Sequence, residues 1–309
     1  MTALEALRFE ALGGRCELYS VPASQPTDLA AVRAWVVAMH DRLTRFTPSS
    51  ELSRINAGAG RWIDVSPELG TLLRRSLTAY TASNGLVHIG VLPALLAAGY
   101  TRDFSAGPTP STGEILIPPP LPEMLEVAAG RARLRAGTAI DLGGIAKGWI
   151  VEKAAQLLHQ YVDICGVSAG GDILFMGHPL DRMDWDVYLE DPRSPVEMLA
   201  QLHIPSGAVA TSSIMKRAWS QGEQVRHHLI DPRTGEPAQT DWLSVTVISP
   251  SVITADVYAK AILIAGEKEL PNLLNEKQDL TFIAVDSEGK LSGSPNYKEY
   301  IYEFTSEPF

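Results

Sequence analysis

A run of eight residues places a carboxylate, two glycines and a lysine directly before a helical pattern. It occupies positions 141–148 and reads D-L-G-G-I-A-K-G, with Asp141 first and Lys147 seventh. Paired glycines allow another molecule to approach the backbone closely. The N-terminus of a helix offers N–H groups and a positive dipole to an anion. The run therefore indicates an anion-binding turn, although a plain strand-to-helix turn with a surface lysine would have the same composition.

Two widespread phosphate-binding motifs do not describe this run. A P-loop requires glycine before the lysine and serine or threonine after it, whereas Lys147 lies between alanine and glycine. The run also lacks the G-x-G-x-x-G pattern of dinucleotide-binding folds. The nature of the site must therefore be sought in other segments of the chain.

The composition bounds the class of protein. The chain has 309 residues and a formal net charge of −10, with 45% hydrophobic and 20% charged residues. This is typical of a soluble globular protein with one large domain or two ordinary ones. The negative charge argues against nonspecific nucleic-acid binding, and no apolar run is long enough to span a membrane. The N-terminus lacks a basic segment followed by an apolar core, so we expect a cytoplasmic protein in which Cys16 and Cys165 are buried thiols.

Helices and strands are interspersed without the regular alternation of a doubly wound sheet. A helix is predicted from Thr27 or Asp28 to about Phe46. Ser66 followed by proline predicts a second helix that ends before position 84, and a third is predicted over 254–264. Strands are predicted at 164–167, 173–176, 184–190, 243–248 and 280–285. The predicted fold class is α+β (mixed α/β).

A proline-rich stretch interrupts the first half of the chain. Residues 103–123 are rich in Pro, Gly, Ser and Thr and show no periodic pattern. We interpret them as a surface loop within one fold rather than as a linker between two domains.

Three further segments carry polar side chains suited to a phosphate site. They read S-E-L-S-R-I-N at 50–56, R-H-H-L-I-D-P-R-T-G at 226–235 and T-A-D-V-Y-A-K at 254–260. Each also has a simpler interpretation. Glu51 could be a solvated or capping residue and Arg54 a surface salt-bridge partner. The D-P-R-T-G segment is a turn sequence, and Asp256 could be only a helix N-cap. In the run at 141–148, Lys147 could extend into solvent.

Taken together, these strings resemble the ApbE family, the FAD:protein FMN transferases. The resemblance runs from Leu12 to Gly266, with the motifs in the order of the family. It implies a single ApbE-like domain over residues 1–309, with mixed or antiparallel sheets flanked by helices. The stretch at 103–123 falls where the family has a variable loop.

The resemblance implies a reaction. The protein would bind FAD with Mg²⁺, split the pyrophosphate and transfer FMN to a threonine hydroxyl of a partner flavoprotein, with release of AMP. The acceptor would carry a D-x-x-[ST]-G-A-T segment, and nothing in this chain resembles that string. Such phosphoryl transfer depends mainly on positioning and on neutralising the charge of the phosphate oxygens.

The resemblance also assigns roles to individual residues. His228 would accept the proton of the attacking hydroxyl, with Asp256 and Asn56 as further catalytic residues. Contacts to the flavin nucleotide would come from Leu12, Ala98, Gly99, Tyr100, Asp141 and Lys147. The metal would be held by Gly144, Asp256 and Ala259, the first and last through backbone carbonyls because neither has a ligating side chain.

One departure from the family concerns the metal. The family has threonine four residues after the metal-binding aspartate, whereas this chain has Lys260. Positions i and i+4 share one face of a helix, so the ammonium should point toward the expected metal position. We therefore expect weakened or absent Mg²⁺ binding. Two alternatives to transfer stay open: an FAD-binding protein of the same family without transfer activity, and an FAD pyrophosphatase.

Overall fold

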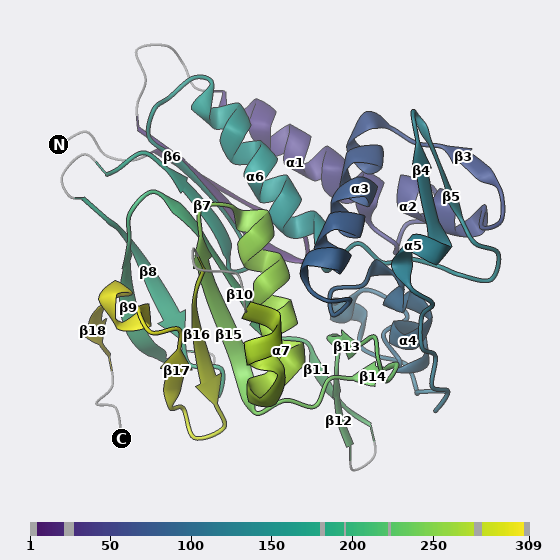
Figure 1. Ribbon diagram of the computed structural model, residues 1–309. Helices are drawn as coiled ribbons and strands as arrows, with labels where there is room; N and C mark the ends of the chain where they lie inside the picture. Colours follow the sequence, from purple (N-terminus) through teal and green to yellow (C-terminus); the bar gives the residue numbers. More distant parts are fainter. Residues whose placement is uncertain are drawn as a thin grey trace.

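The chain folds around one large antiparallel sheet. The computed structural model describes residues 5–21, 28–179, 183–194, 196–221, 224–274 and 280–305. Helices cover one face of the sheet and a smaller sheet covers the other (Figure 1). Every pairing between described strands is antiparallel. This arrangement confirms the predicted α+β fold class.

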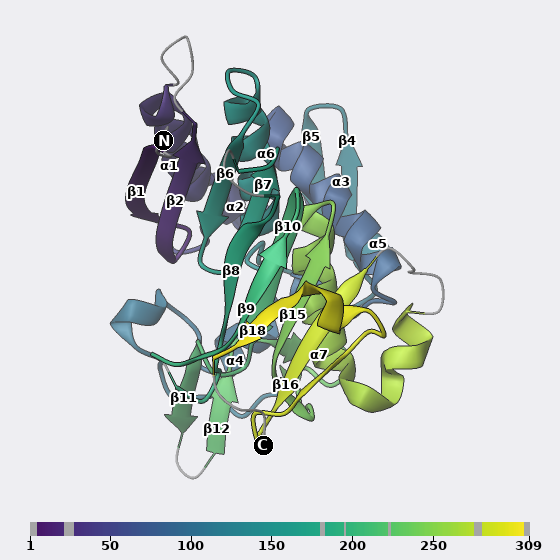
Figure 2. The same ribbon diagram turned by 90° about the vertical axis from the view of Figure 1, so that its left-hand side faces the viewer.

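The large sheet contains eight strands in the order β1-β2-β6-β7-β10-β15-β16-β17. Figure 2 shows the N-terminal hairpin at one edge of the sheet, with the later strands following across the molecule. The strand bounds are Glu5–Ala11, Gly14–Ser20, Cys165–Ala169, Asp172–Met176, Gly207–Ser213, Trp242–Ser249, Thr281–Asp286 and Leu291–Gly293, in the same order.

Apolar side chains on both faces of the central strands form two hydrophobic cores. In β10, Ala208 packs into the core on the helical face, while Val209 packs into the core on the opposite face. In β16, Phe282 and Ile283 divide in the same way. Successive side chains of a strand point to opposite faces, so a sheet covered on both sides needs apolar residues at nearly every position.

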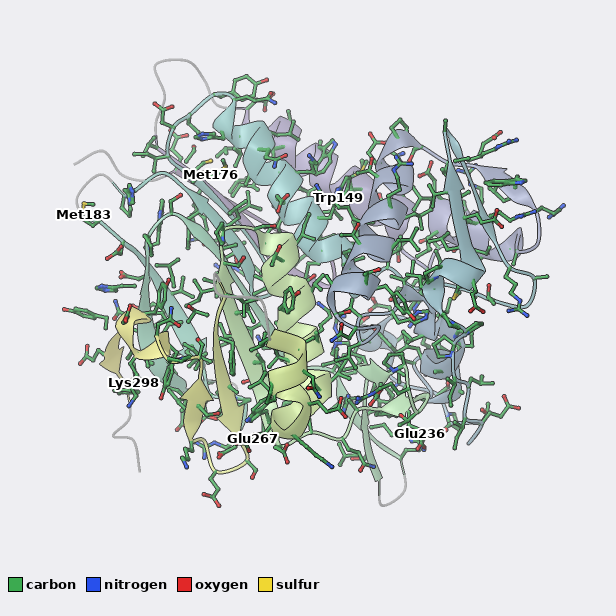
Figure 3. All side chains as sticks on the ribbon, in the orientation of Figure 1. Trp149, Met176, Met183, Glu236, Glu267 and Lys298 are labelled. Atoms are coloured by element: carbon green, nitrogen blue, oxygen red, sulfur yellow. The ribbon has the colours of Figure 1, made fainter. Side chains whose placement is uncertain are left out.

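Two helices lie side by side on the helical face: α6 (Ala146–His159) and α7 (Val252–Leu274). Trp149 of α6 is buried and packs against Trp35 of α1 (Leu29–Leu43), with 6.0 Å between ring centroids (Figure 3). Helix α7 is kinked at Gly266, whose φ of +66° interrupts the helical backbone. The predicted helix at 254–264 is the part before this kink.

The two N-terminal helical predictions are confirmed with small changes at their ends. Asp28 caps α1 by accepting from the Ala31 N–H, and the helix ends at Leu43 instead of about Phe46. Thr27, the other cap candidate, lies outside the described residues. Ser66 caps α3 (Pro67–Ala82) as expected. Cys16 and Cys165 are buried free thiols, and burial raises the pKa of Cys16 to about 11.

In Figure 1, α2 and the strands β3, β4 and β5 lie beside α3, and a second group of elements lies near the lower part of the large sheet. Helix α4 and the hairpins β11–β12 and β13–β14 lie close together there (Figure 1). The bounds are α2 Glu51–Ala57, β3 Trp62–Asp64, η1 Ile89–Val91, α4 Leu92–Ala97, η2 Phe104–Ala106, α5 Leu121–Met124, β4 Leu125–Ala128, β5 Arg131–Leu134, β11 Ala218–Gln221, β12 Gln224–His227, β13 Ile230–Asp231 and β14 Glu236–Pro237.

The proline-rich stretch is exposed over most of its length, but the prediction of a loop to position 123 is wrong at its end. Helix α5 begins at Leu121, which is fully buried, and the single turn η2 lies near its start. Proline at the second position of α5 is compatible with a helix start. Among the described residues, no helix combines the length and apolarity needed to cross a membrane.

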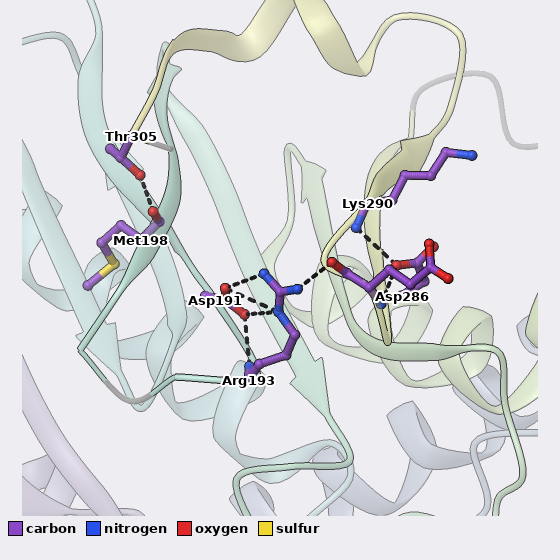
Figure 4. Close-up of polar contacts among 7 residues, drawn as sticks. Asp191, Arg193, Met198, Asp286, Lys290 and Thr305 are labelled. Carbon is purple, nitrogen blue, oxygen red and sulfur yellow. Dashed lines mark hydrogen bonds and ion pairs between the residues drawn. The ribbon is translucent and has the colours of Figure 1, made fainter. Parts of the chain in front are cut away.

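The smaller sheet has the order β18-β9-β8, with bounds Ile301–Phe304, Met198–Ile204 and Trp185–Glu190. Arg193, just after β8, ties it to the large sheet. Its guanidinium donates to both carboxylate oxygens of Asp191 at 2.7 and 2.9 Å and to the Glu288 carbonyl beyond β16 (Figure 4).

One turn near the predicted flavin tripeptide depends on glycine. Gly99 has a φ of +100°, and a Cβ at this position would collide with the carbonyl oxygen of Thr109. We expect Gly99→Ala to lower the free energy of unfolding by about 3 kcal/mol, combining left-handed strain with overpacking. Gly130→Ala is the matched control, because Gly130, in the turn between β4 and β5, has a φ of +70° but open space around it, so that only about 1 kcal/mol should be lost. Urea denaturation measures both, and equal losses would contradict the steric argument.

Candidate active site

Two tight hairpin turns lie beside each other at one end of the large sheet. Leu12 and Gly13 join β1 to β2 with φ values of +56° and +77°, and Gly170 and Gly171 join β6 to β7 with +54° and +96°. Two-residue hairpins with type I′ turns require positive φ at both central positions. Because β2 begins opposite the end of β6, the two turns meet at the same edge of the site.

Three cationic side chains reach these turns. A Cβ on Gly13 would lie 2.6 Å from the Arg217 guanidinium, so the absence of a side chain makes room for this arginine. The ammonium groups of Lys147 and Lys216 lie 3.7 and 3.9 Å from the Cβ positions of Gly170 and Gly171. Lys216 pairs with Glu190, whereas Arg217 forms no ion pair within the described part of the chain.

Asp172 follows the second turn and is fully buried. Its Oδ2 lies 3.1 Å from Nζ of Lys147, which also donates to the Gly170 carbonyl at 3.1 Å. Lys147 therefore does not simply extend into solvent. Burial raises the pKa of Asp172 to about 6, and the nearby Asp256 carboxylate adds to this effect against the opposing charges of Lys147 and Lys260.

Asp256 and Lys260 form a second buried pair, one helical turn apart on α7. Asp256 is 1% exposed and its Oδ1 accepts an ion-paired hydrogen bond from the Lys260 ammonium. Its Oδ2 has no hydrogen-bond partner in the described residues. Asp256 lies inside α7, which begins at Val252, so the interpretation of this residue as an N-cap is wrong.

Glycines bring the helices close enough to join the two pairs. A Cβ on Gly148 of α6 would lie 3.0 Å from Cβ of Asp256, so α6 packs tightly on α7 at this point. A Cβ on Gly144 would lie 3.8 Å from Cδ of Lys260. The Lys260 side chain therefore lies beside the D-L-G-G turn, where the sequence predicted a metal.

The predicted metal ligands do not fit a divalent cation. Gly144 and Ala259 could offer only backbone carbonyls, and Oδ1 of Asp256, the one carboxylate of the predicted set, is engaged by an ammonium. Mg²⁺ demands a nearly octahedral set of oxygen ligands, and a lysine ammonium has no acceptor to offer. Two unit charges 4 Å apart repel by about 4 kcal/mol at an effective dielectric constant of 20, and a divalent cation about twice as strongly. Within the described ranges, no group of three His, Cys, Asp or Glu side chains could hold a metal.

Asp141 and Asn56 hold the D-L-G-G turn in place. Asp141 Oδ1 accepts from the Gly143 N–H at 2.7 Å, and its Oδ2 pairs with Nε of Arg45 at 2.8 Å. Asn56 Nδ2 donates to the Ile140 carbonyl at 2.9 Å, and the Ile140 N–H donates to Asn56 Oδ1 at 2.8 Å. Both side chains thus act on the backbone around the turn.

The tripeptide 98–100 is linked to this turn through Arg45. Arg45 donates to the Tyr100 carbonyl at 2.7 Å, and its guanidinium lies 4.6 Å from the centroid of the Tyr100 ring. Tyr100 and Ala98 are buried in a small cluster with Trp219 of β11. Burial raises the pKa of Tyr100, which keeps its phenol neutral.

The two adjacent histidines have different environments. His227 is buried, and its Nε2 lies 3.0 Å from the Ala238 carbonyl, which indicates a structural role. His228 has a buried Nδ1 without a hydrogen-bond partner in the described chain. Burial lowers the pKa of His228 well below its usual value, and Arg217 adds the largest charge effect, with smaller ones from Lys260 and Lys147. His228 is therefore a neutral imidazole at pH 7 within a cationic surrounding.

The segment after His228 is the expected turn. Residues 231–235 connect β13 to β14, with the Gly235 N–H donating to the Asp231 carbonyl at 2.9 Å. Asp231 also pairs with Arg233 at 2.7 Å. A Cβ on Gly235 would lie 2.8 Å from the Leu116 backbone, so the proline-rich stretch packs directly against this turn.

Three residues of the site were missed in the sequence. Asp172 had a detectable signal, because an acidic residue after a double glycine between two apolar strands requires a buried partner. Arg45 and Arg217 had none, since neither lies in a recognisable motif. Their positions are defined only by how the β1–β2 turn and residues 98–100 fold toward them.

Comparisons with known proteins agree with the sequence motifs. The model of the ApbE family matches residues 12–284. An FAD:protein FMN transferase of Treponema pallidum (strain Nichols) is 30% identical over 248 residues, covering 74% of this chain and 68% of the relative. An FAD:protein FMN transferase of Vibrio cholerae serotype O1 is 25% identical over 271 residues, covering 85% of this chain and 81% of the relative.

Solved structures show the same fold. The ApbE protein of Thermotoga maritima superposes with a TM-score of 0.86 at 24% identity, covering 97% of this chain and 100% of that chain. The flavin transferase ApbE of Vibrio cholerae superposes with a TM-score of 0.80 at 22% identity, covering 96% and 100%. From the extent of the family match and the identity to the Treponema relative, the chain belongs to the ApbE family.

Proposed function

We propose that this protein binds FAD and transfers its FMN moiety to a hydroxyl group of a partner protein. The hydroxyl oxygen forms a new bond to the FMN phosphorus as the bond from this phosphorus to the bridging oxygen breaks. AMP leaves with the bridging oxygen, and the hydroxyl proton passes to a base. The observation that carries this proposal is the buried charge cluster of Asp172, Lys147, Asp256 and Lys260 beside the D-L-G-G turn of an ApbE-family chain.

The diphosphate of FAD would bind where the hairpin turns meet α6. Lys147 and Arg217 place positive charge beside the glycines of both turns, where no side chain blocks an approaching phosphate. Helix α6 begins at Ala146 without a side-chain cap. The Ala146 N–H donates to the Leu142 carbonyl, so the N–H groups of Lys147 and Gly148 would meet the same anion. Asp141 and Asn56 would serve by positioning this backbone.

The flavin would lie on the side of the turn formed by Leu12 and the tripeptide 98–100. Tyr100 is 8% exposed and is linked through Arg45 to Asp141, so the aromatic wall and the phosphate turn form one connected unit. The left-handed Leu12 brings an apolar side chain to the hairpin next to Arg217.

His228 is the candidate base. A neutral imidazole can accept the proton of an attacking hydroxyl, and its unpartnered Nδ1 is free to do so. The cations that lower the pKa of His228 are the groups that a bound diphosphate would neutralise. Binding of the substrate would therefore raise the pKa of His228 and strengthen the base where it is needed.

The partner would present a threonine in a D-x-x-[ST]-G-A-T segment. No step of the proposed transfer needs a divalent metal in this chain.

A second candidate function is FAD binding without transfer. It is favoured by one observation, the engagement of Asp256 by Lys260, because this ion pair replaces the cation on which transfer was expected to depend.

We expect purified protein incubated with FAD and an acceptor of this kind to release AMP and to add the mass of FMN to the acceptor. Covalent flavin fluorescence on a denaturing gel and chromatography of AMP measure the two products. FAD that stays intact would favour the binding-only alternative, while AMP and FMN released without an acceptor would indicate a pyrophosphatase.

The role of His228 has its own test. We expect His228→Asn to lower the rate of transfer by about 10²-fold or more while leaving FAD affinity nearly unchanged. The matched control is His159→Asn at the exposed end of α6, which should change neither quantity. A wild-type transfer rate in the His228 variant would remove this residue from the mechanism.

The raised pKa of Asp172 predicts a pH dependence of binding. Below about pH 6 its carboxyl is protonated, so the cluster becomes more positive and attracts the diphosphate more strongly. If the ligand raises the pKa of Asp172 by one further unit, FAD affinity should increase about sixfold between pH 7.5 and pH 5.5. Asp172→Asn should abolish this dependence in calorimetric titrations. Its persistence in the variant would assign the effect to another group.

A further inference from the structure

We propose that Lys147 and Lys260 form a two-ammonium site that binds the diphosphate of FAD in place of a divalent cation. Nucleotide binding by this protein would then be independent of metal. This inference rests on the proposed function, since it assumes that the site takes FAD, but it makes a separate claim about what neutralises the phosphates.

The two lysines approach the same turn from different helices. Lys147 belongs to the first turn of α6, directly after the D-L-G-G segment. Lys260 belongs to α7 and runs alongside Gly144, the third residue before Lys147. Both are close enough to His228 to act on its imidazole electrostatically. The two ammonium groups therefore belong to a single site at the helix entry.

Each ammonium is fixed by its own buried carboxylate. Asp172 holds Lys147 and Asp256 holds Lys260, with both carboxylates at most 2% exposed. The lysine side chains are themselves largely covered, at 21% and 12% exposed. Side chains held in this way lose little further conformational freedom when an anion binds, so the site is preorganised.

Each ammonium also keeps bonding capacity for a phosphate. An ammonium carries three donors. Lys147 uses one of them on the Gly170 carbonyl, and its contact with Asp172 is an ion pair without a hydrogen bond in the described residues. Lys260 uses one on Oδ1 of Asp256 and makes only a long contact, 3.4 Å, to the Asp256 carbonyl. Together the two groups carry two positive charges, the charge of one Mg²⁺ ion. Each is balanced by its own carboxylate in the free protein, so the site attracts a diphosphate through its directed N–H donors rather than through net charge.

The competing interpretation is that Lys260 only neutralises Asp256 and never meets a ligand. The two interpretations differ in how nucleotide affinity responds to metal. A purely structural Lys260 leaves FAD binding dependent on whatever cation the solution supplies. If Lys260 binds the phosphate, FAD binding by the unmodified protein does not change when a chelator removes metal. A variant without the Lys260 ammonium should then lose affinity when the chelator is present.

The test is calorimetric titration of FAD into the whole protein, in EDTA and in Mg²⁺. We expect equal affinity of the unmodified protein in both solutions. Lys260→Thr should lose about ten- to hundredfold affinity in EDTA, the value of one charge-assisted hydrogen bond, and recover part of it with Mg²⁺. Lys260→Arg, which keeps the charge, should still bind in EDTA. The control is Lys153→Thr on α6, where the half-buried Lys153 donates to the Gln156 side chain of the same helix.

Several results would overturn the proposal. Affinity of the unmodified protein that falls in EDTA would show that a metal is needed, while leaving the proposed transferase function intact. Unchanged affinity of Lys260→Thr in EDTA would make Lys260 structural. No FAD binding in either solution would reject both this inference and the proposed function. The measurement on the unmodified protein stands even if a variant fails to fold.

Discussion

Two buried carboxylate–ammonium pairs join the parts of this molecule that make up its site. Asp172 on β7 holds Lys147 on α6, and Asp256 holds Lys260 within α7, so sheet and helices are tied by charge at one point. Removing one partner from a buried ion pair typically costs about 3–5 kcal/mol, because the other charge stays in the interior without compensation. The four residues must therefore be considered together, and a change in one alters the environment of the other three.

This arrangement is possible only because several positions lack side chains. Gly148 lets α6 approach the Asp256 side chain, and Gly13 leaves room for the Arg217 guanidinium. The close packing at Gly148 and the open space at the glycine turns have opposite effects on the access of water. Close helix packing excludes water from the carboxylates, which strengthens their attraction to the lysines. The open glycine turns leave the other side of the ammonium groups accessible to a ligand.

Much of the fold could be predicted from the sequence, because its signals are local. Ser66 followed by proline gave the start of α3, and the alternation of apolar residues gave the central strands. The residues of the site were harder to predict from the sequence. Lys260 was correctly expected on the helix face of Asp256, since that relation is fixed by helical spacing. Arg217 reaches Gly13 and Arg45 reaches Tyr100, each more than fifty positions away in sequence, and only the folded backbone brings them there.

The charges of the site also explain why His228 would become a stronger base only after the substrate has bound. In the free protein each lysine is balanced by a carboxylate, and Arg217 is the cation near His228 that has no such partner among the described residues. Arg217 is also the charge that lowers the pKa of His228 most. A diphosphate that pairs with Arg217 would remove this influence first, so the imidazole would gain basicity only once the substrate is in place. Proton transfer would then be coupled to nucleotide binding through a single electrostatic contact.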